Sequence, residues 1–471
     1  MKRIVAVLLM IFLFTSPCYA GEQLDRGVYW ESKQVTMPDN QPNAINYLAV
    51  DLADKKVEIK PVLALNKFAS VSPLSEMALN YGAIGGINGT FFNMKVPYTP
   101  VDDLIQEGKL LSRSPRSTTA LVMTYDNQFL ITKTKPEVYL NFASGNTLQI
   151  DYVNRTPGEG VVLYTPDVGT NTNNPMTTLE AVIEKNPVGQ WSITGVYNGN
   201  APIPAAGYVL SLQGSAAMAS TDDIIAGSKL DIQFKNMRNV RYLWACGPGL
   251  VKDGAVITPL DYEELNGSIV KDRNPRSAIG LTADNKLLLV TVDGRQAGVS
   301  TGMTFEELAE LMLSLGAKQA MALDGGGSTE LWAGNQVANS LIDGTERSVM
   351  NGLLVISQIP VYVNSERLYF DVPPVIEQGR TLLPVRKIME KMGAQVNWEQ
   401  NTQTVSIQNG SNSISLKIGT RQAAVNGKMV KLDVAPKVIQ GRTMIPIRFI
   451  SENLGYKVQW DAARERVYIA Q

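Results

Sequence analysis

The chain has 471 residues, a formal net charge of −1 and no histidine. The missing histidine excludes Ser-His-Asp and Cys-His catalysis and histidine-bound zinc, so acid–base chemistry falls to Asp, Glu, Tyr or Lys, and any metal would be a hard cation on oxygen ligands. The nearly neutral charge gives no electrostatic reason to expect nucleic acid or an anionic membrane as a partner.

The first 20 residues have the pattern of a secretory signal peptide. Lys2 and Arg3 precede an apolar run over 4–14, and small residues occupy the −3 and −1 positions before Gly21. The apolar run is about 11 residues long, short of the roughly 20 that span a bilayer. We therefore expect cleavage after residue 20 and a mature protein that is secreted or associated with the cell wall, with no membrane partner.

The residues after this segment predict many strands and one early helix. Apolar residues alternate over 46–52 and 56–63, and a helix-like stretch over 74–81 leads into the glycine-rich segment 85–93. Residues 137–235 contain short strand-like runs interrupted by Gly, Asn and Pro, and no boundary separates them from their neighbours. This part of the chain is expected to be α+β with mixed sheets.

A strand–helix–strand unit follows. The apolar run 286–292 predicts a buried strand, Thr304 and Glu307 have the spacing of a helix capping box, and the apolar positions 305, 308, 311, 312 and 315 form one helix face that ends at Gly316. Residues 319–323 predict the next strand. If the two strands are parallel, Asp293 and Asp324 leave the same edge of one sheet, where ligands of such sheets bind.

The residues beside these aspartates suit an anionic ligand. Three consecutive glycines, 325–327, let a backbone approach a ligand closely, and their N–H groups can cradle an anion. Arg295 could hold a phosphate through two hydrogen bonds. A turn or loop cap is the alternative for each Asp-Gly pair taken alone.

The C-terminal part contains an internal repeat. Residues 374–386 return as 436–448 at an offset of 62, and Trp398 matches Trp460. Each copy predicts a turn, a strand, a helix and further strands, so the two copies are expected to pack as one small α+β domain. This segment resembles the copper amine oxidase N-terminal-like domain, without the ligands for copper. We expect it to fold independently and to be dispensable for chemistry.

The larger part of the chain resembles the phosphodiester glycosidase family, whose animal member removes N-acetylglucosamine to uncover mannose 6-phosphate. The resemblance rests on Gly-Gly-Ile-Asn-Gly-Thr-Phe-Phe at 85–92, Asn-Pro-Arg-Ser-Ala-Ile-Gly at 274–280, Asp-Gly-Arg-Gln at 293–296, Leu-Asp-Gly-Gly-Gly-Ser at 323–328 and Glu-Arg at 346–347. It implies hydrolysis of a sugar-1-phosphodiester. By motif position, Asp293 and Asp324 are the catalytic candidates, and the substrate-binding candidates are Asn88, Arg276, Arg295, Gly325, Gly326, Gly327, Ser328 and Arg347.

The expected organisation is a signal peptide over 1–20, a catalytic domain over 21–358 and a duplicated module over 359–471. The substrate would be a glycosyl phosphate, with a wall glycopolymer or an exopolysaccharide intermediate as its source. No cofactor is required, although Ca²⁺ or Mg²⁺ between the two aspartates stays open. The competing hypothesis is a non-catalytic protein that binds the cell wall or a polysaccharide.

Overall fold

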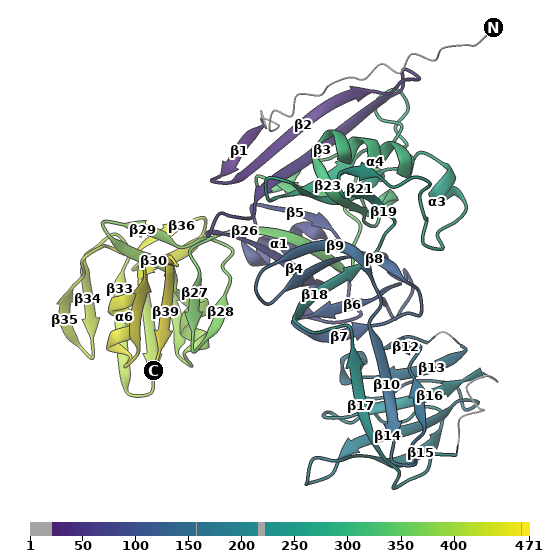
Figure 1. The fold of residues 1–471 in the computed structure, drawn as a ribbon. Coiled ribbons are helices and arrows are strands. Elements are labelled where there is room, and N and C mark those ends of the chain that lie inside the picture. Colours follow the sequence, from purple (N-terminus) through teal and green to yellow (C-terminus); the bar gives the residue numbers. More distant parts are fainter. Residues whose placement is uncertain (1–20, 157, 215–221, 463) are drawn as a thin grey trace.

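The structure is a computed structural model that describes residues 21–471 except 157, 215–221 and 463 (Figure 1). The expected signal peptide, residues 1–20, lies outside the described residues. In the part of the chain that is described, no helix is long and apolar enough to cross a membrane. Strands dominate the fold, and most pairs are antiparallel, with parallel pairs at β12–β13 and β27–β39.

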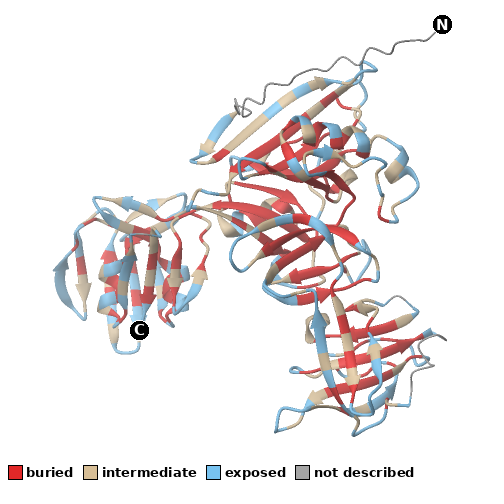
Figure 2. Cartoon of the chain, viewed as in Figure 1, coloured by how far each residue is buried: buried red, intermediate tan, exposed pale blue. Residues whose placement is uncertain are grey.

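An eight-stranded sheet forms the centre of the larger part. In spatial order its strands are β1 (Glu22–Asp25), β2 (Val28–Thr36), β3 (Pro42–Asp51), β22 (Lys286–Val292), β21 (Arg276–Thr282), β23 (Ala317–Ala322), β19 (Gly249–Lys252) and β20 (Ala255–Val256). Side chains alternate along β22, so Leu287 and Leu289 enter one core while Leu288 and Val290 enter another. Both faces of this sheet are therefore covered at its central strands, whereas β1 and most of β2 are intermediate or exposed (Figure 2).

Helix α4 (Phe305–Ser314) covers one face of the central sheet, and its expected capping box is present between Thr304 and Glu307. Its apolar face is buried as the periodicity predicts, from Phe305 to Leu315. The strand–helix–strand prediction over 286–323 is thus confirmed. The helix passes over β21, which lies between β22 and β23 and is antiparallel to both.

Two five-stranded sheets cover the other face through a shared apolar core. The first has the order β25 (Gln336–Val337), β24 (Leu331–Ala333), β5 (Gly85–Asn88), β26 (Asn351–Ser357) and β4 (Val57–Leu63), and α1 (Leu74–Tyr81) packs on its outer side. The second has the order β7 (Lys109–Ser112), β6 (Leu104–Gln106), β18 (Val240–Ala245), β8 (Thr118–Thr124) and β9 (Phe129–Thr134).

Residues 137–235 form a separate sheet, inserted in the chain between β9 and β18 (Figure 1). Its order is β11 (Thr147–Gln149), β10 (Glu137–Phe142), β17 (Lys229–Lys235), β15 (Trp191–Asn198), β14 (Leu179–Lys185), β16 (Tyr208–Gln213), β13 (Gly160–Tyr164) and β12 (Tyr152–Val153). The expected catalytic domain over 21–358 therefore carries an additional strand-rich body that the sequence did not delimit.

The C-terminal module has three sheets around its own core. They are β28 (Glu366–Leu368), β27 (Val361–Val363), β39 (Arg466–Ala470) and β38 (Lys457–Asp461); β29 (Val375–Glu377), β30 (Arg380–Pro384), β37 (Arg442–Pro446) and β36 (Lys437–Ile439); and β31 (Gln395–Glu399), β32 (Thr404–Asn409), β33 (Asn412–Lys417), β34 (Gln422–Val425) and β35 (Lys428–Lys431). Helix α5 (Val385–Lys391) follows β30, and α6 (Ile447–Asn453) follows β37. Each copy of the repeat therefore contains the helix that the sequence predicts.

The module is held against the larger part by specific contacts. Gln358 is 4% exposed, and its amide donates to the carbonyl oxygens of Tyr81 at 2.6 Å, Gly82 at 3.2 Å and Phe370 at 2.8 Å. Tyr369 donates to Glu58 at 2.7 Å. The junction is therefore a hydrogen-bonded interface, and not the open linker that an easily cleaved boundary needs.

Replacing Gln358 by Ala should weaken this junction. The change leaves buried carbonyl groups without a donor, which costs about 1–3 kcal/mol. We expect a lower melting temperature and faster limited proteolysis near residues 359–371. Gln408→Ala, at an exposed strand position of the module, is the matched control and should change neither. Equal proteolysis of the two variants would contradict a docked module.

Candidate functional site

One edge of the central sheet collects three of the expected site segments. Because β21 is antiparallel to β22 and β23, its first residue, Arg276, begins at the edge where the other two strands end. Asp293 directly follows β22, and Asp324 follows β23 after one intervening residue. The two aspartates thus leave the same edge of the sheet, separated by the width of β21.

Asn88, at the end of β5, forms hydrogen bonds to three segments at this edge of the sheet. Its side-chain nitrogen donates to the Asp324 carbonyl oxygen at 2.7 Å, and its oxygen accepts from Ser277 Oγ at 2.6 Å and from the Glu330 N–H at 3.1 Å. The residue is fully buried. The structure therefore does not support the expected role of Asn88 in binding substrate, because its amide is occupied in fixing the backbone that carries Asp324.

The glycine run after Asp324 is packed too tightly for larger residues. The Gly326 N–H donates to the Pro275 carbonyl at 2.9 Å, and a Cβ on Gly325 would lie 2.8 Å from that same oxygen. A Cβ on Gly327 would overlap the guanidinium of Arg347. Gly326 is thus occupied within the protein and does not serve in the expected anion cradle, whereas Gly327 allows Arg347 to approach the backbone.

Asp324 is the acid at the centre of this loop. Burial raises the pKa of its carboxyl from 3.8 to about 7, against the opposing effects of a hydrogen bond from Ser328, the positive charge of Arg347 and the Gly325 N–H. A carboxyl with this pKa changes its protonation state near neutral pH, a property common in catalytic acids and bases. Ser328, predicted as a substrate ligand, instead supports Asp324.

Asp293 is held in a different environment. It is 3% exposed, and its carboxylate accepts hydrogen bonds from the Ser340 N–H at 3.1 Å and from Asn339 at 3.3 Å. Burial raises its pKa, and these two donors oppose the rise. Asp293 therefore takes its hydrogen bonds from the 339–340 segment, whereas Asp324 takes its own from Ser328 and the Gly325 N–H and lies near the charge of Arg347.

Arg276 does not face a ligand. It is 2% exposed, and it donates to the carbonyl oxygens of Met303 at 2.8 Å and Ile269 at 2.9 Å. Its guanidinium also lies over the ring of Phe305, 3.9 Å from the centroid. Burial lowers its pKa to about 10, and the nearby charge of Arg295 adds to this. The prediction that Arg276 grips a phosphate is therefore not supported, and Arg276 is assigned to the junction of β21 and α4.

Arg295 and Arg347 are the arginines beside the glycine loop. Arg295 has a backbone φ of +58°, and Asn274 Oδ1 holds its guanidinium at 2.6 Å. Its terminal nitrogens would lie 3.7 and 3.9 Å from a Cβ at Gly326. Arg347 lies against Gly327, and its nearest acid in the chain, Asp343, is 3.9 Å away. Two cations therefore flank the loop next to Asp324, an arrangement that suits a phosphate.

The sequence did not reveal a second acidic feature, Glu330. This residue is 2% exposed, and burial together with the nearby Glu346 raises the pKa of its carboxyl to about 8. Glu346 acts on this pKa through its negative charge and through a hydrogen bond that favours the protonated form of Glu330. A single Glu after the Gly-Gly-Gly-Ser-Thr run carries no periodic signal, so only its tertiary contacts identify it.

The acidic side chains of this site do not form a larger carboxylate cluster. Among the residues that the structure describes, no group of three or more Asp, Glu or Cys side chains is placed to hold a metal ion. The sequence left a Ca²⁺ or Mg²⁺ ion between Asp293 and Asp324 as an open alternative. In the structure each of these two carboxylates has its own protein donors.

Comparison with known proteins matches the two parts of the chain to two families. Residues 181–356 match the phosphodiester glycosidase family, and residues 362–469 match the copper amine oxidase N-terminal domain. The SPbeta prophage-derived uncharacterized protein YomE of Bacillus subtilis is 32% identical over 155 residues, which are 32% of this chain and 23% of that protein.

Two solved structures share the fold. A hypothetical protein from Synechocystis superposes with a TM-score of 0.63 at 21% identity, covering 71% of this chain and 62% of that one. A putative exported protein from Burkholderia pseudomallei superposes with a TM-score of 0.54 at 21% identity, covering 67% and 74%.

Proposed function

We propose that this chain, whose residues 181–356 match the phosphodiester glycosidase family, is an exported hydrolase that cleaves the bond between a sugar's anomeric carbon and a phosphate. The observation that carries the proposal is the placement of Asp324, with a pKa of about 7, beside a glycine loop flanked by Arg295 and Arg347. The chain spans only 23% of its relative YomE, so the activity rests on this site and the family match.

In this proposal the two arginines hold the phosphate oxygens, and the Gly327 N–H adds a backbone donor. A phosphodiester on an anomeric carbon already leaves readily, so the harder task is to stabilise the positive charge that develops on the sugar ring. Asp324, when ionised, performs this task either as an electrostatic partner or as a nucleophile. Asp293 acts as a positioning residue that fixes the 339–340 segment.

The substrate class follows from the same groups. A phosphate between two guanidinium groups needs no charge on the sugar, and a wall glycopolymer or an exopolysaccharide intermediate supplies such a diester outside the cell. The C-terminal module would serve this enzyme as a repeated structural unit with no part in the chemistry.

The direct test is release of free sugar from a soluble sugar-1-phosphodiester by the mature protein. Arg347→Met should raise KM and lower kcat/KM by roughly 10²–10³-fold, because a charged donor to the phosphate is lost. Arg386→Met, at an exposed position of α5 far along the chain from the site, is the control and should leave turnover unchanged. A mature protein without turnover on any glycosyl phosphodiester would instead favour a non-catalytic polysaccharide-binding protein.

Whether turnover needs a divalent cation can be tested separately. We propose that Asp324 acts on the sugar without the help of a divalent cation, so exhaustive dialysis against a chelator should leave turnover within about twofold of the untreated protein. Loss of activity on chelation, with recovery on addition of Ca²⁺ or Mg²⁺, would contradict this.

A further inference from the structure

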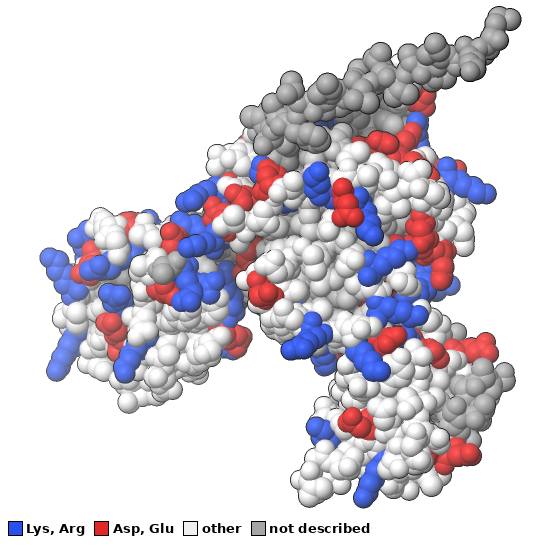
Figure 3. Space-filling view, in the orientation of Figure 1, with Lys and Arg blue, Asp and Glu red and all other residues white. Residues whose placement is uncertain are grey.

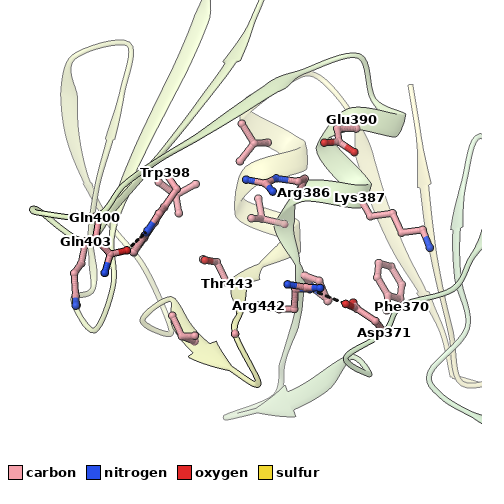
Figure 4. Close-up of a pocket in the computed structure, with 16 residues that line it drawn as sticks. Phe370, Asp371, Arg386, Lys387, Glu390, Trp398, Gln400, Gln403, Arg442 and Thr443 are labelled. Carbon is pink, nitrogen blue, oxygen red and sulfur yellow. Dashed lines mark hydrogen bonds and ion pairs between the residues drawn. The ribbon is translucent and has the colours of Figure 1, made fainter. Parts of the chain in front are cut away.

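The C-terminal module contains a groove that the proposed chemistry does not use. This first groove has a volume of about 840 Å³ and lies between α5, β31 and the turn before β37 (Figure 4). Trp398 stands on one side of it, Arg442 with Asp371 on the other, and Arg386 between them. Residues from both repeats therefore build one cavity.

A second groove of about 490 Å³ repeats this arrangement with the roles of the two copies exchanged. Its lining residues match those of the first groove at the repeat offset of 62: Trp460 for Trp398, Arg448 for Arg386, Arg380 for Arg442, and Asp433 for Asp371. The module thus presents the same set of side chains twice, once in each groove.

Each groove exposes an indole ring. Trp398 is 37% exposed and Trp460 is 41% exposed, whereas Phe370, which also lines the first groove, is fully buried. The Trp398 ring is also fixed, since its Nε1 donates to Gln400 Oε1 at 2.6 Å. A fixed indole whose face meets solvent can stack against the C–H groups of a flat ligand at little entropic cost.

Each groove also holds an oriented guanidinium. The Arg442 Nε donates to Asp371 at 2.6 Å, and the Arg380 Nε donates to Asp433 at 2.7 Å. In each case the ion pair engages Nε, and the arginine lines its groove. One terminal nitrogen of Arg380 also donates to the Gly379 carbonyl oxygen at 3.4 Å. Arg386 has no ion pair among the described residues. Such arginines bind carboxylate or phosphate oxygens.

The net charge of the module also favours an acidic ligand. Residues 359–471 contain 15 Lys and Arg and nine Asp and Glu, a net charge of +6 in a chain whose net charge is −1. Basic side chains are visible over the module surface in Figure 3. The net positive charge of the module therefore favours an anionic ligand.

We propose that the two grooves are equivalent binding sites for an acidic polysaccharide. In each site the indole face stacks on a sugar ring, while the guanidinium groups bind a carboxylate or phosphate on the same or the next sugar. Two sites on one rigid module then bind one polymer together, which raises the affinity for the polymer well above that for a short oligosaccharide. The sites are separate from Asp324 and its loop, so this proposal stands or fails independently of the hydrolase.

The test titrates the full mature chain carrying Asp324→Asn, which should lack turnover, in a calorimeter with two acidic probes, tetragalacturonate and a synthetic tetrasaccharide linked by phosphodiesters. Maltotetraose is the neutral control. We expect at least one acidic probe to bind with two molecules per chain, one in each groove. Maltotetraose should bind at least about tenfold more weakly. Comparing the two acidic probes shows whether the grooves recognise a carboxylate or a phosphate group.

Variants assign the binding to the grooves. Trp398→Ala and Trp460→Ala should each remove one site, and the double variant should remove both, while turnover of a small soluble glycosyl phosphodiester stays unchanged. Arg386→Gln and Arg448→Gln should weaken the acidic probes without affecting folding, since both side chains are exposed. Met429→Ala, at an exposed position on β35 outside both grooves, is the matched control.

Three results would overturn the proposal: no binding of either acidic probe, binding that persists in the folded double tryptophan variant, or equal binding of maltotetraose. Tighter binding of single-stranded oligothymidylate than of both acidic probes would also overturn it, in favour of a nucleic-acid site. On an immobilised acidic polymer, loss of one tryptophan should reduce the apparent affinity by about tenfold or more, because the second contact is lost.

Discussion

Replacing Asp324 by Asn is expected to abolish turnover while making the protein more stable. Asn keeps the shape and the hydrogen-bond acceptor that Ser328 and the Gly325 N–H contact, but it cannot ionise. Removing a general base or nucleophile of this kind lowers kcat by roughly 10²–10⁴-fold. Sugar release from a sugar-1-phosphodiester at saturating substrate measures this loss.

The stability gain follows from the sign of the pKa shift. The Asp324 pKa is raised from 3.8 in the unfolded chain to about 7 in the fold, so the folded protein retains a proton that the unfolded chain releases. Stability is therefore lost as the pH rises from about 4 to about 7, and the full cost is present above pH 7. The melting temperature of the Asn variant should exceed that of the parent at pH 8 and match it near pH 4.

The same group sets the pH dependence of activity. If the ionised form of Asp324 acts on the sugar, kcat/KM should rise with pH and level off above an apparent pKa of about 7. Arg347 lowers this pKa, so Arg347→Met should move the rising limb to higher pH. If kcat/KM of the parent protein instead rises near pH 4, Asp324 is not the group whose ionisation controls the reaction. Equal melting temperatures of the parent protein and Asp324→Asn at pH 8 would show that the fold does not disfavour the ionised form of the Asp324 carboxyl.

The strand–helix–strand unit was predictable because its signals are local. The run 286–292 is apolar throughout, as a strand buried on both faces must be, and the capping box fixes the start of α4 within one residue. The insertion of β21 between the two strands was not predictable. β21 pairs with β22 across a short turn, but its pairing with β23 bridges the whole of α4 and leaves no local signal in the sequence. The boundary at residue 137 was missed because strand-rich segments on both sides have the same period of two.

The candidate site was predicted at the level of motifs and not of side chains. Asp324, Arg295 and Arg347 lie at one loop, as their order in the family motifs suggested. Asn88 and Arg276 belong to the same edge, but their polar atoms contact backbone groups that only the fold brings near. Whether an Arg or Asn binds a ligand or a buried carbonyl depends on tertiary contacts, so motif membership does not separate the two roles.

Replacing Gly327 by Ala should reduce activity with little change in stability. The added Cβ would overlap the Arg347 guanidinium, the far end of a flexible side chain, so the arginine moves and the backbone does not. Because the displaced guanidinium no longer faces the phosphate, kcat/KM should fall by roughly 10²-fold, close to the effect of Arg347→Met. Steady-state kinetics and thermal unfolding of the same preparation measure both effects.

The neighbouring glycine supplies the contrast. In Gly325→Ala the new Cβ would lie 2.8 Å from the Pro275 carbonyl oxygen, which is backbone and cannot move aside cheaply, so this variant should lose stability as well as activity. The double variant Gly327→Ala with Arg347→Met should be no less active than Arg347→Met alone, because both changes remove one interaction. If the two losses of activity add, Gly327 contributes separately from Arg347, for instance through its N–H. The space that a glycine leaves at position 327 is then not needed for Arg347.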